Sequence, residues 1–174
     1  MPQASEREMY RPVRARHEGF LVDRHRGCVV RVLDGSRTSL ARLVDREGLA
    51  EGLAPEWPSW DMKVDVVGFA IGEGGTHWAF VECKPNAVNL RALSQPLGYS
   101  RVARPVYSFI VAPHGASDAL RSLLLTFSRL DVLRYREEAG QLPWSIVVAR
   151  WDSTRGCIDT GSMITGDRGR IGRL

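Results

Sequence analysis

Two carboxylates and a lysine stand where they could act together. The segment 78–84, WAFVECK, is apolar and rich in aromatic and β-branched residues, yet it ends with Glu82 and Lys84. Side chains two residues apart on a strand point to the same face, so these two charges are expected to share one side. Asp65 lies in the preceding segment, VDVVGF. If the two segments pair as a hairpin, Asp65 comes close to both charges.

These residue types are suited to metal-assisted hydrolysis at phosphorus. Carboxylate oxygens bind Mg²⁺ or Mn²⁺, and such a metal keeps several waters for substrate oxygens. A metal-bound water is a better nucleophile, and a neighbouring ammonium can orient it or stabilise the charged phosphorus centre. Lys63 and Lys84 are the two lysines among 24 basic residues. An ammonium at position 84 therefore indicates a place that the wider arginine guanidinium would not fill.

The elements expected to position these residues alternate between helix and strand. Helices are predicted over 5–21, 36–48, 86–103 and 116–138, the last being the clearest. Strands are predicted over 28–35, 61–71, 78–84, 105–113 and 144–151. Pro12 is expected to kink or interrupt the helix that contains it, and Pro96 is expected to break the helix over 86–103. The predicted fold class is α/β, with a central mixed β-sheet flanked by helices.

Length and composition favour one globular domain. The 174 residues, with 44% hydrophobic and 25% charged residues, can build a single core, expected over residues 1–151. Residues 152–174 are rich in Gly and Arg and are expected to form a mobile tail. The polar N-terminus and the short apolar runs favour a cytoplasmic protein without a membrane partner. A net charge of +4 and a pI near 9.3 are compatible with a nucleic-acid partner.

Several other kinds of site are disfavoured. Three widely spaced cysteines argue against a disulfide framework or a cysteine-only metal centre, and the four histidines lack ligand spacing. Serines near glycines lack the context of a nucleophile elbow, and no phosphate-binding loop of the Walker type is present.

VDVVGF followed by FVECK, and then by a segment with SQPLGY, resembles the PD-(D/E)xK nuclease superfamily over residues 5–113. That family has the restriction-endonuclease-like fold. The resemblance implies that Asp65 and Glu82 bind Mg²⁺, for which Mn²⁺ could substitute, and that Lys84 is catalytic. It also implies that the backbone carbonyl of Cys83 completes the metal shell. The chain departs from the family pattern at Val64, where the pattern has proline.

Three further residues match features of some branches of this family. Gln95 and Tyr99 resemble the QxxxY motif of RecB-like members, which implies Gln95 near the metal site and Tyr99 near DNA. Glu8 is similar to a first-helix glutamate that adds an acidic group to the metal site. Two of them have an ordinary structural alternative: Glu8 as the capping partner of Ser5, and Tyr99 as an aromatic at the edge of the core.

Arginines near the motif supply candidate contacts to phosphate. Arg91 and Arg101 flank the segment that follows FVECK and could bind nucleic-acid phosphates, or they could be solvated surface charges.

The function predicted from the sequence is a divalent-metal-dependent nuclease, with DNA as the favoured nucleic acid. Two alternatives keep the same fold. One is a catalytically silent nucleic-acid-binding or scaffold module, and the other is a dimeric junction-resolving endonuclease. For the dimer, the segment 116–138 would be an interface, although it could equally be core. DNA and RNA, single and double strands, and internal and terminal cleavage are all compatible with these residues.

Overall fold

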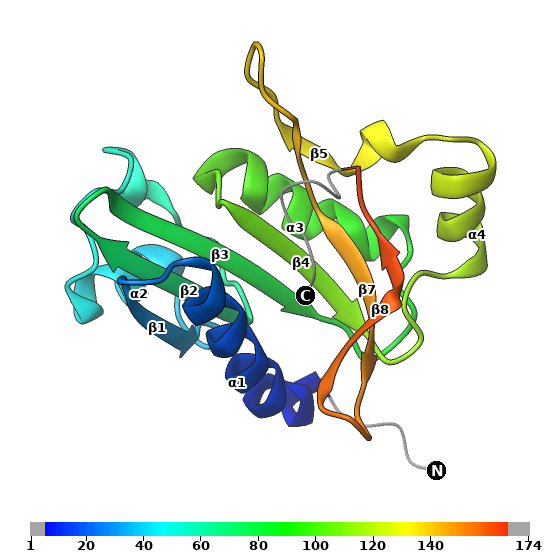
Figure 1. Ribbon diagram of the computed structural model, residues 1–174, viewed down its shortest axis with the longest axis horizontal. Coiled ribbons are helices and arrows are strands. Elements are labelled where there is room, and N and C mark those ends of the chain that lie inside the picture. The colour runs from blue at the N-terminus through cyan, green and yellow to red at the C-terminus, as the bar shows by residue number, and fades with distance from the viewer. Residues whose placement is uncertain (1–5, 167–174) are drawn as a thin grey trace.

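A computed structural model describes residues 6–166 and has a central sheet with helices on both faces (Figure 1). The helices are α1 (Glu6–Arg24), α2 (Leu40–Glu47), α3 (Leu90–Ala103) and α4 (Asp118–Arg121), with short turns η1 (Trp57–Ser59), η2 (Ser122–Thr126) and η3 (Leu130–Leu133). The strands are β1 (Val29–Asp34), β2 (Val66–Gly72), β3 (Gly75–Cys83), β4 (Tyr107–Ala112), β5 (Arg134–Arg136), β6 (Trp144–Ser145), β7 (Val147–Asp152) and β8 (Cys157–Ile164).

The main sheet is mixed. Its strands lie in the order β1-β2-β3-β4-β7-β8, while β5 and β6 form a separate two-stranded sheet. The pairs β1–β2, β2–β3 and β7–β8 are antiparallel, and β3–β4 and β4–β7 are parallel. Helix α3 connects the parallel strands β3 and β4, as such a crossover requires. The predicted α/β class with a mixed, helix-flanked sheet is confirmed.

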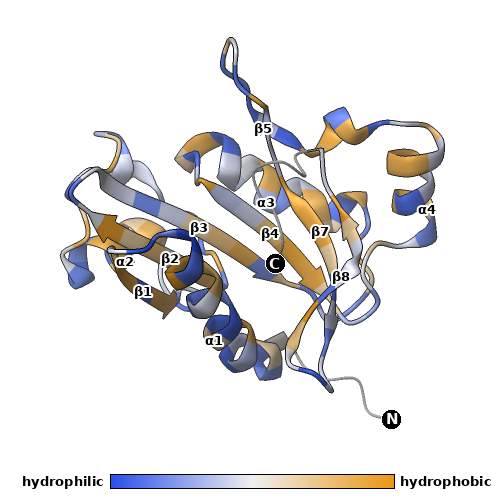
Figure 2. Cartoon of the chain, in the orientation of Figure 1, coloured by the Kyte–Doolittle hydropathy of each residue, from blue (hydrophilic) through white to orange (hydrophobic). Residues whose placement is uncertain are grey.

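Alternation along the strands divides the core into two layers, one on each face of the sheet. On β3, Val81 and Cys83 pack with α1, whereas Phe80 packs on the opposite face with α2 and the segment before β2. On the same side of the sheet as Phe80, the part formed by β4 and β7 is covered by α3, α4 and the turns after α4. Both faces are covered, and Figure 2 shows that β2 and β4 are hydrophobic over much of their length, whereas β3 and β8 also carry hydrophilic residues.

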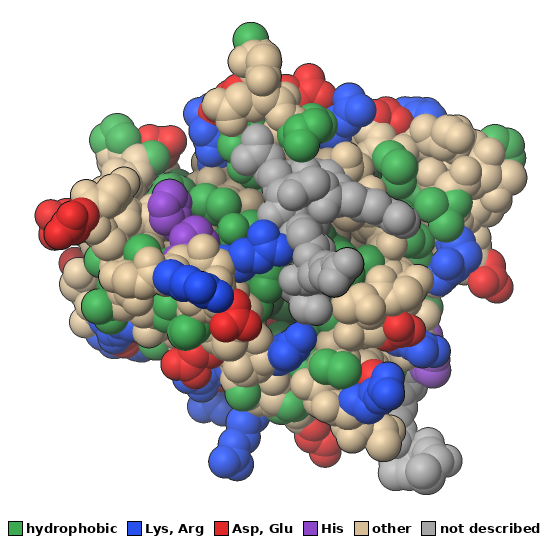
Figure 3. All heavy atoms as spheres, viewed as in Figure 1, with side chains coloured by type: hydrophobic (Ala, Val, Ile, Leu, Met, Phe, Trp, Pro, Cys, Tyr) green, Lys and Arg blue, Asp and Glu red, His purple; other side chains and the backbone are tan. Residues whose placement is uncertain are grey.

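The surface of the described residues carries charges of both signs. On the face shown in Figure 3, Lys and Arg side chains lie singly among acidic and neutral ones. No helix within residues 6–166 is both long and apolar enough to cross a membrane.

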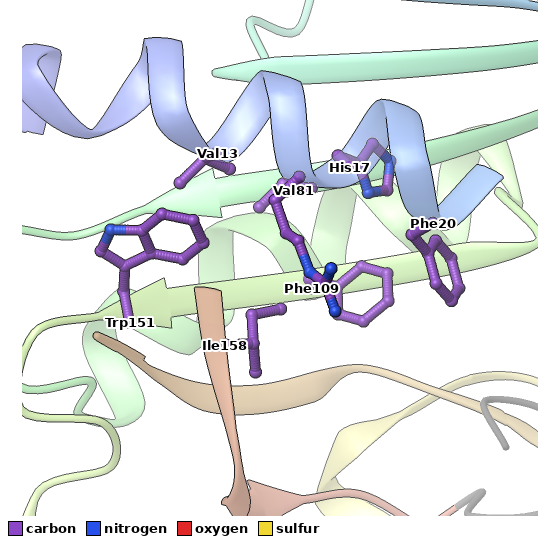
Figure 4. A pocket seen from close by; sticks show the side chains of 8 residues that line it. Val13, His17, Phe20, Val81, Phe109, Trp151 and Ile158 are labelled. Carbon is purple, nitrogen blue, oxygen red and sulfur yellow. The ribbon is translucent and has the colours of Figure 1, made fainter. Parts of the chain in front are cut away.

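Helix α1 is held on its face of the sheet by aromatic packing around a buried histidine (Figure 4). The His17 ring stacks on Phe20 and meets the edge of Phe109 on β4. Burial lowers the pKa of His17 from 6.5 to about 3, because the charged form would lose its hydration there. His17 is therefore neutral at pH 7 and serves as part of the core.

The two prolines do not interrupt their helices, contrary to the prediction. Helix α1 continues through Pro12, and α3 continues through Pro96. Pro96 lies on the buried stripe of α3 together with Leu93, Ser100 and Ala103. Packing of this stripe against the sheet, including a hydrogen bond of 2.8 Å between Ser100 and Ser108, outweighs the loss of one backbone hydrogen bond.

The helix predicted over 116–138 is wrong beyond its first turns. Helical structure ends at Thr126, and Ser128 has a left-handed φ of 55°. The chain then makes the turn η3 and the strand β5. The buried positions change from helical spacing (Leu120, Leu124) to strand spacing (Leu133, Tyr135), so the segment belongs to the core and does not form a long interface helix.

The sheet continues beyond the predicted end of the domain at residue 151. Strand β8 pairs with β7, and Ile164 is buried in the core. Much of the expected tail is therefore an edge strand. Residues 167–174 of that tail lie outside the described part of the chain.

Candidate active site

A polar cavity of about 450 Å³ opens at the end of β3. We name it the first cavity. Its walls come from α1, the turn after β1, the segment before β2, the end of β3 and α3. The residues that line it are Arg7, Tyr10, Ser36, Arg37, Lys63, Asp65, Glu82, Lys84 and Gln95.

Asp65 is fixed by two hydrogen bonds. The Tyr10 hydroxyl of α1 donates to Oδ1 at 2.8 Å, and the Cys83 backbone N–H of β3 donates to Oδ2 at 2.8 Å. The residue is only 7% exposed. The predicted strand 61–71 begins later than expected, since β2 starts at Val66. Asp65 thus lies just before β2. Its carboxylate accepts the hydrogen bond from the Cys83 N–H that a backbone carbonyl of a neighbouring strand would otherwise accept.

Local backbone contacts place the turn after β1 beside this carboxylate. The N–H of Gly35 donates to the Asp65 carbonyl at 3.1 Å. A Cβ at position 35 would lie 2.4 Å from the Val64 carbonyl oxygen, so glycine is needed for this approach. Asp34 then accepts hydrogen bonds from the backbone N–H and hydroxyl of Ser36, which forms the tight turn that carries Arg37 into the cavity wall.

Glu82 lies at the end of β3, and Lys84 directly follows the strand, which ends at Cys83. Glu82 is 4% exposed, and the Lys84 ammonium donates to its Oε1 at 2.7 Å. Glu82 pairs with Ile110 of β4, and this pairing fixes the backbone position at the end of β3. A buried carboxylate of this kind needs a charged or hydrogen-bonding partner, and Lys84 supplies one.

Three further cations line the first cavity. Arg7, Arg37 and Lys63 are exposed, and none of the three makes an ion pair with another residue in 6–166. With Lys84 they give four positive charges around the two carboxylates of Asp65 and Glu82. The lining therefore carries a net charge of +2, which favours an anion.

A second cavity of about 330 Å³ adjoins the first and shares Lys84 and Gln95 with it. The rest of its wall is the connection between β3 and α3 and the first turn of α3. Its other lining residues are Pro85, Asn86, Ala87, Asn89, Arg91 and Ala92. Arg91 is thus near the motif, as proposed from the sequence.

The remaining candidates are divided between the site and other surfaces. Gln95 lies in the wall of both cavities and donates through Nε2 to the Tyr99 hydroxyl at 3.1 Å. Tyr99 is half-buried and packs against the core cluster on its face of the sheet. Arg101 lines a separate cavity with residues of β5 and the turn before it, away from the first cavity. Glu8 is exposed on α1 and does not line the first cavity.

The two carboxylates can supply part of the ligand shell of a magnesium ion. Within residues 6–166 no group of three or more His, Cys, Asp and Glu side chains is placed to hold a metal. Mg²⁺, however, is commonly bound by one or two carboxylates, with waters and substrate phosphate oxygens completing its shell. Asp65 and Glu82 provide two such hard oxygen ligands at a polar cavity. The donor set therefore fits Mg²⁺ or Mn²⁺ and does not fit a closed structural metal site.

Cys83 could contribute through its backbone only. Its side chain is fully buried in the core cluster beneath α1, so the thiol does not line the cavity. Its N–H donates to Asp65, and in a strand the N–H and C=O of one residue point to the same side. The Cys83 carbonyl is therefore directed to the side of β3 on which Asp65 lies.

Several lining residues were not identified as site residues from the sequence. Tyr10 and Arg7 come from α1, and Arg37 comes from the turn after β1. Lys63 comes from the segment before β2. The one available signal was its alternation with Asp65, which places the two side chains on one side of an extended segment.

Comparison with known proteins adds no relative: no family model, curated protein or solved structure matches this chain.

Proposed function

We propose that this protein is a divalent-metal-dependent nuclease of the PD-(D/E)xK type, with a restriction-endonuclease-like core. The observation that carries the proposal is the lining of the first cavity. Two buried carboxylates and the Lys84 ammonium meet there, surrounded by three exposed cations without ion-pair partners among the described residues. Nucleic-acid phosphodiesters match this arrangement, because they bring negative charge and need a nucleophile delivered to phosphorus.

Each group has a role in this proposal. Asp65 and Glu82 would hold Mg²⁺, with the Cys83 carbonyl directed to the same place. The metal would supply a water of lowered pKa and would neutralise charge on the phosphate. Lys84 would leave Glu82 to orient the attacking water and to stabilise negative charge on the phosphate oxygens. Gln95, at the junction of the cavities, would hold the substrate in place through its amide.

The cations of the first cavity would bind the phosphates of the substrate. Arg7 and Arg37 present guanidinium groups that can donate two parallel hydrogen bonds to one phosphate. Their positive charge would also bring a polyanion to the two carboxylates, which would otherwise repel it. DNA is the favoured substrate on the strength of the family resemblance.

The test is cleavage of labelled single-stranded, duplex and branched DNA and of RNA, each with Mg²⁺, Mn²⁺ or EDTA. Asp65→Asn, Glu82→Gln and Lys84→Met are expected to lower the rate at least about 100-fold while the proteins remain folded. Asp61→Asn is the matched control, because Asp61 is an exposed carboxylate in the same segment and does not line the cavity. Its rate should equal that of the unmodified protein.

Metal binding is measured separately by titrating each folded protein with Mn²⁺ and following the free ion by electron paramagnetic resonance. Saturable binding that Asp65→Asn weakens would support the carboxylates as ligands. Full activity in purified Asp65→Asn or Glu82→Gln would refute the assignment of the site.

A second candidate is a nucleic-acid-binding module without catalysis. The Lys84–Glu82 ion pair favours it, because the lysine already satisfies one of the two carboxylates. This module would bind nucleic acid under every condition, would cut nothing and would show no Mn²⁺ binding that depends on Asp65. A dimeric junction-resolving enzyme would instead cut only the branched DNA and would sediment as a dimer.

A further inference from the structure

We propose that the substrate strand passes through both cavities, so that the bond cut lies inside the strand and not at its end. This inference rests on the proposed nuclease function and adds the mode of attack. It follows from where the cations lie relative to Asp65 and Glu82, and from the chemistry of the second cavity.

The two cavities are neighbours. They meet at Lys84 and Gln95, which line both. Asp65 and Glu82 line only the first cavity, so a phosphate at these carboxylates has the second cavity as its neighbour on the Lys84 side. A strand that leaves the carboxylates on this side must enter the second cavity.

The second cavity is suited to the nucleotide next to the bond that is cut. Its volume of about 330 Å³ lies in the range of small-molecule pockets, and it combines small apolar residues with polar ones. The side-chain oxygen of Asn89 accepts from the Ala92 N–H, which leaves its NH₂ group to donate to a ligand. Arg91 adds an exposed guanidinium that makes no ion pair within residues 6–166. An amide donor and a cation beside small apolar surface match a base or sugar with its phosphate.

The remaining cations lie in the wall of the first cavity. Arg7, Arg37 and Lys63 line the same cavity as Asp65 and Glu82 and are absent from the lining of the second cavity. Positive charge is thus present in both cavities, around the carboxylates in the first and at Arg91 in the second. A strand that ends at the carboxylates would need contacts in the first cavity only, whereas a strand that continues past them on the Lys84 side would use the cations of both cavities.

The experiment compares circular and linear forms of one single-stranded DNA in Mn²⁺. If the linear assay shows that only RNA is cut, circular and linear RNA of one sequence are used. We expect the circle to be opened at a rate similar to internal cleavage of the linear form. A circle that stays intact while the linear form is degraded from its ends would overturn this inference and leave the nuclease function standing.

A binding measurement tests whether both cavities contact the strand, without the need for catalysis. Fluorescence anisotropy in EDTA follows a labelled oligonucleotide bound by Arg91→Ala, Arg37→Ala or Arg129→Ala. Arg91→Ala and Arg37→Ala should each weaken binding about fivefold to tenfold, since each removes one charge-assisted contact. Arg129 pairs with Asp131 and lines neither cavity, so its substitution should have no effect. If Arg37→Ala weakens binding and Arg91→Ala does not, the strand does not pass through the second cavity and the inference fails. If nothing is cut and no Mn²⁺ binds, the proposed function fails and this inference fails with it.

Discussion

Asp65 is oriented by the protein itself, independently of any ligand. Tyr10 and the Cys83 N–H each donate to one of its two oxygens, and both donors belong to elements that are packed into the core. A carboxylate oxygen has more than one lone pair, so these hydrogen bonds fix the orientation of Asp65 while leaving it able to bind a cation. In the proposed site Tyr10 is therefore a positioning residue.

Tyr10→Phe removes one of these two donors and little else. We expect a loss of about 1 kcal/mol in the free energy of unfolding and an increase of about tenfold in the Mn²⁺ concentration needed for half-maximal cleavage. Tyr135→Phe is the control, because the buried Tyr135 hydroxyl donates to the Pro105 carbonyl away from the cavity. It should lower the stability by a similar amount and leave the Mn²⁺ requirement unchanged. An unchanged requirement in Tyr10→Phe would show that Tyr10 is only structural.

The residues of the motif could be predicted from the sequence, but Tyr10 could not. Glu82 and Lys84 are two residues apart on one strand, and Asp65 is near them through a hairpin, so local periodicity places all three. Tyr10 is separated from Asp65 by 55 positions along the chain. Their contact depends on how α1 crosses the sheet, and a pattern of apolar residues in α1 does not specify that crossing.

His17 makes the stability depend on pH. Its pKa is lowered to about 3 in the folded protein from 6.5, so between these values the unfolded chain binds the proton more readily. Protonation therefore favours unfolding, and the free energy of unfolding should fall as the pH falls below 6.5. The slope from this residue is at most about 1.4 kcal/mol per pH unit and is lost below about pH 3.

Urea unfolding at pH 7.5, 6.0, 5.0 and 4.0 measures this dependence for the unmodified protein and for His17→Leu. His17→Leu should lose less stability than the unmodified protein over this range, because it has no imidazole to protonate at this position. His114→Gln serves as the control at an exposed histidine and should follow the unmodified protein. Parallel pH curves for the unmodified protein and His17→Leu would contradict this account.

At the scale of elements, the close approach of α1 to β2 depends on Gly68. A Cβ at this position would lie 2.4 Å from Leu21 Cδ1 and 3.0 Å from two ring atoms of His17. Gly68→Ala should therefore displace the buried Leu21 and His17 side chains of α1 and lower the free energy of unfolding by about 1–3 kcal/mol. Gly98→Ala in α3 is the matched control, because no atom lies within 4 Å of its Cβ. It should raise stability by up to about 1 kcal/mol, since alanine is the better helix former. Thermal unfolding of both variants checks the prediction, and an equal effect of the two would refute it.

The elements that could be predicted are those whose periodicity agrees with their final structure. The apolar strands β3 and β4 are of this kind. The segment after Asp118 is different, since Leu120 and Leu124 follow helical spacing while Leu133 and Tyr135 follow strand spacing. A helical pattern sought over the whole segment 116–138 does not detect that change of spacing. Strand β8 was missed because it contains Gly161 and is only partly buried, and its structure depends on pairing with β7.

At the scale of the whole molecule, basic residues are scattered among acidic ones, and the fold brings four of them together at the first cavity. The net charge of +4 is modest, and Figure 3 shows basic and acidic side chains interspersed on one face. The first cavity, by contrast, gathers Arg7, Arg37, Lys63 and Lys84 from four separate parts of the chain. This grouping could not be predicted from composition, because it depends on how distant segments meet around β3.

The four cations of the first cavity lead to a prediction about how nucleic-acid binding depends on salt concentration. Binding of a polyanion releases counterions, so the logarithm of the association constant should fall linearly with the logarithm of the salt concentration. If Arg7 and Lys63 each contact a phosphate, Arg7→Ala and Lys63→Ala should each reduce the magnitude of this slope by about 0.7–0.9 for DNA. Arg129→Ala, which removes a cation already paired with Asp131, should leave the slope unchanged.

Anisotropy titrations in EDTA from 50 to about 300 mM KCl measure the slope without cleavage. Equal slopes for all three variants would mean that the first cavity binds no phosphate backbone, whereas a change confined to Arg7→Ala and Lys63→Ala would place the nucleic acid over Asp65 and Glu82.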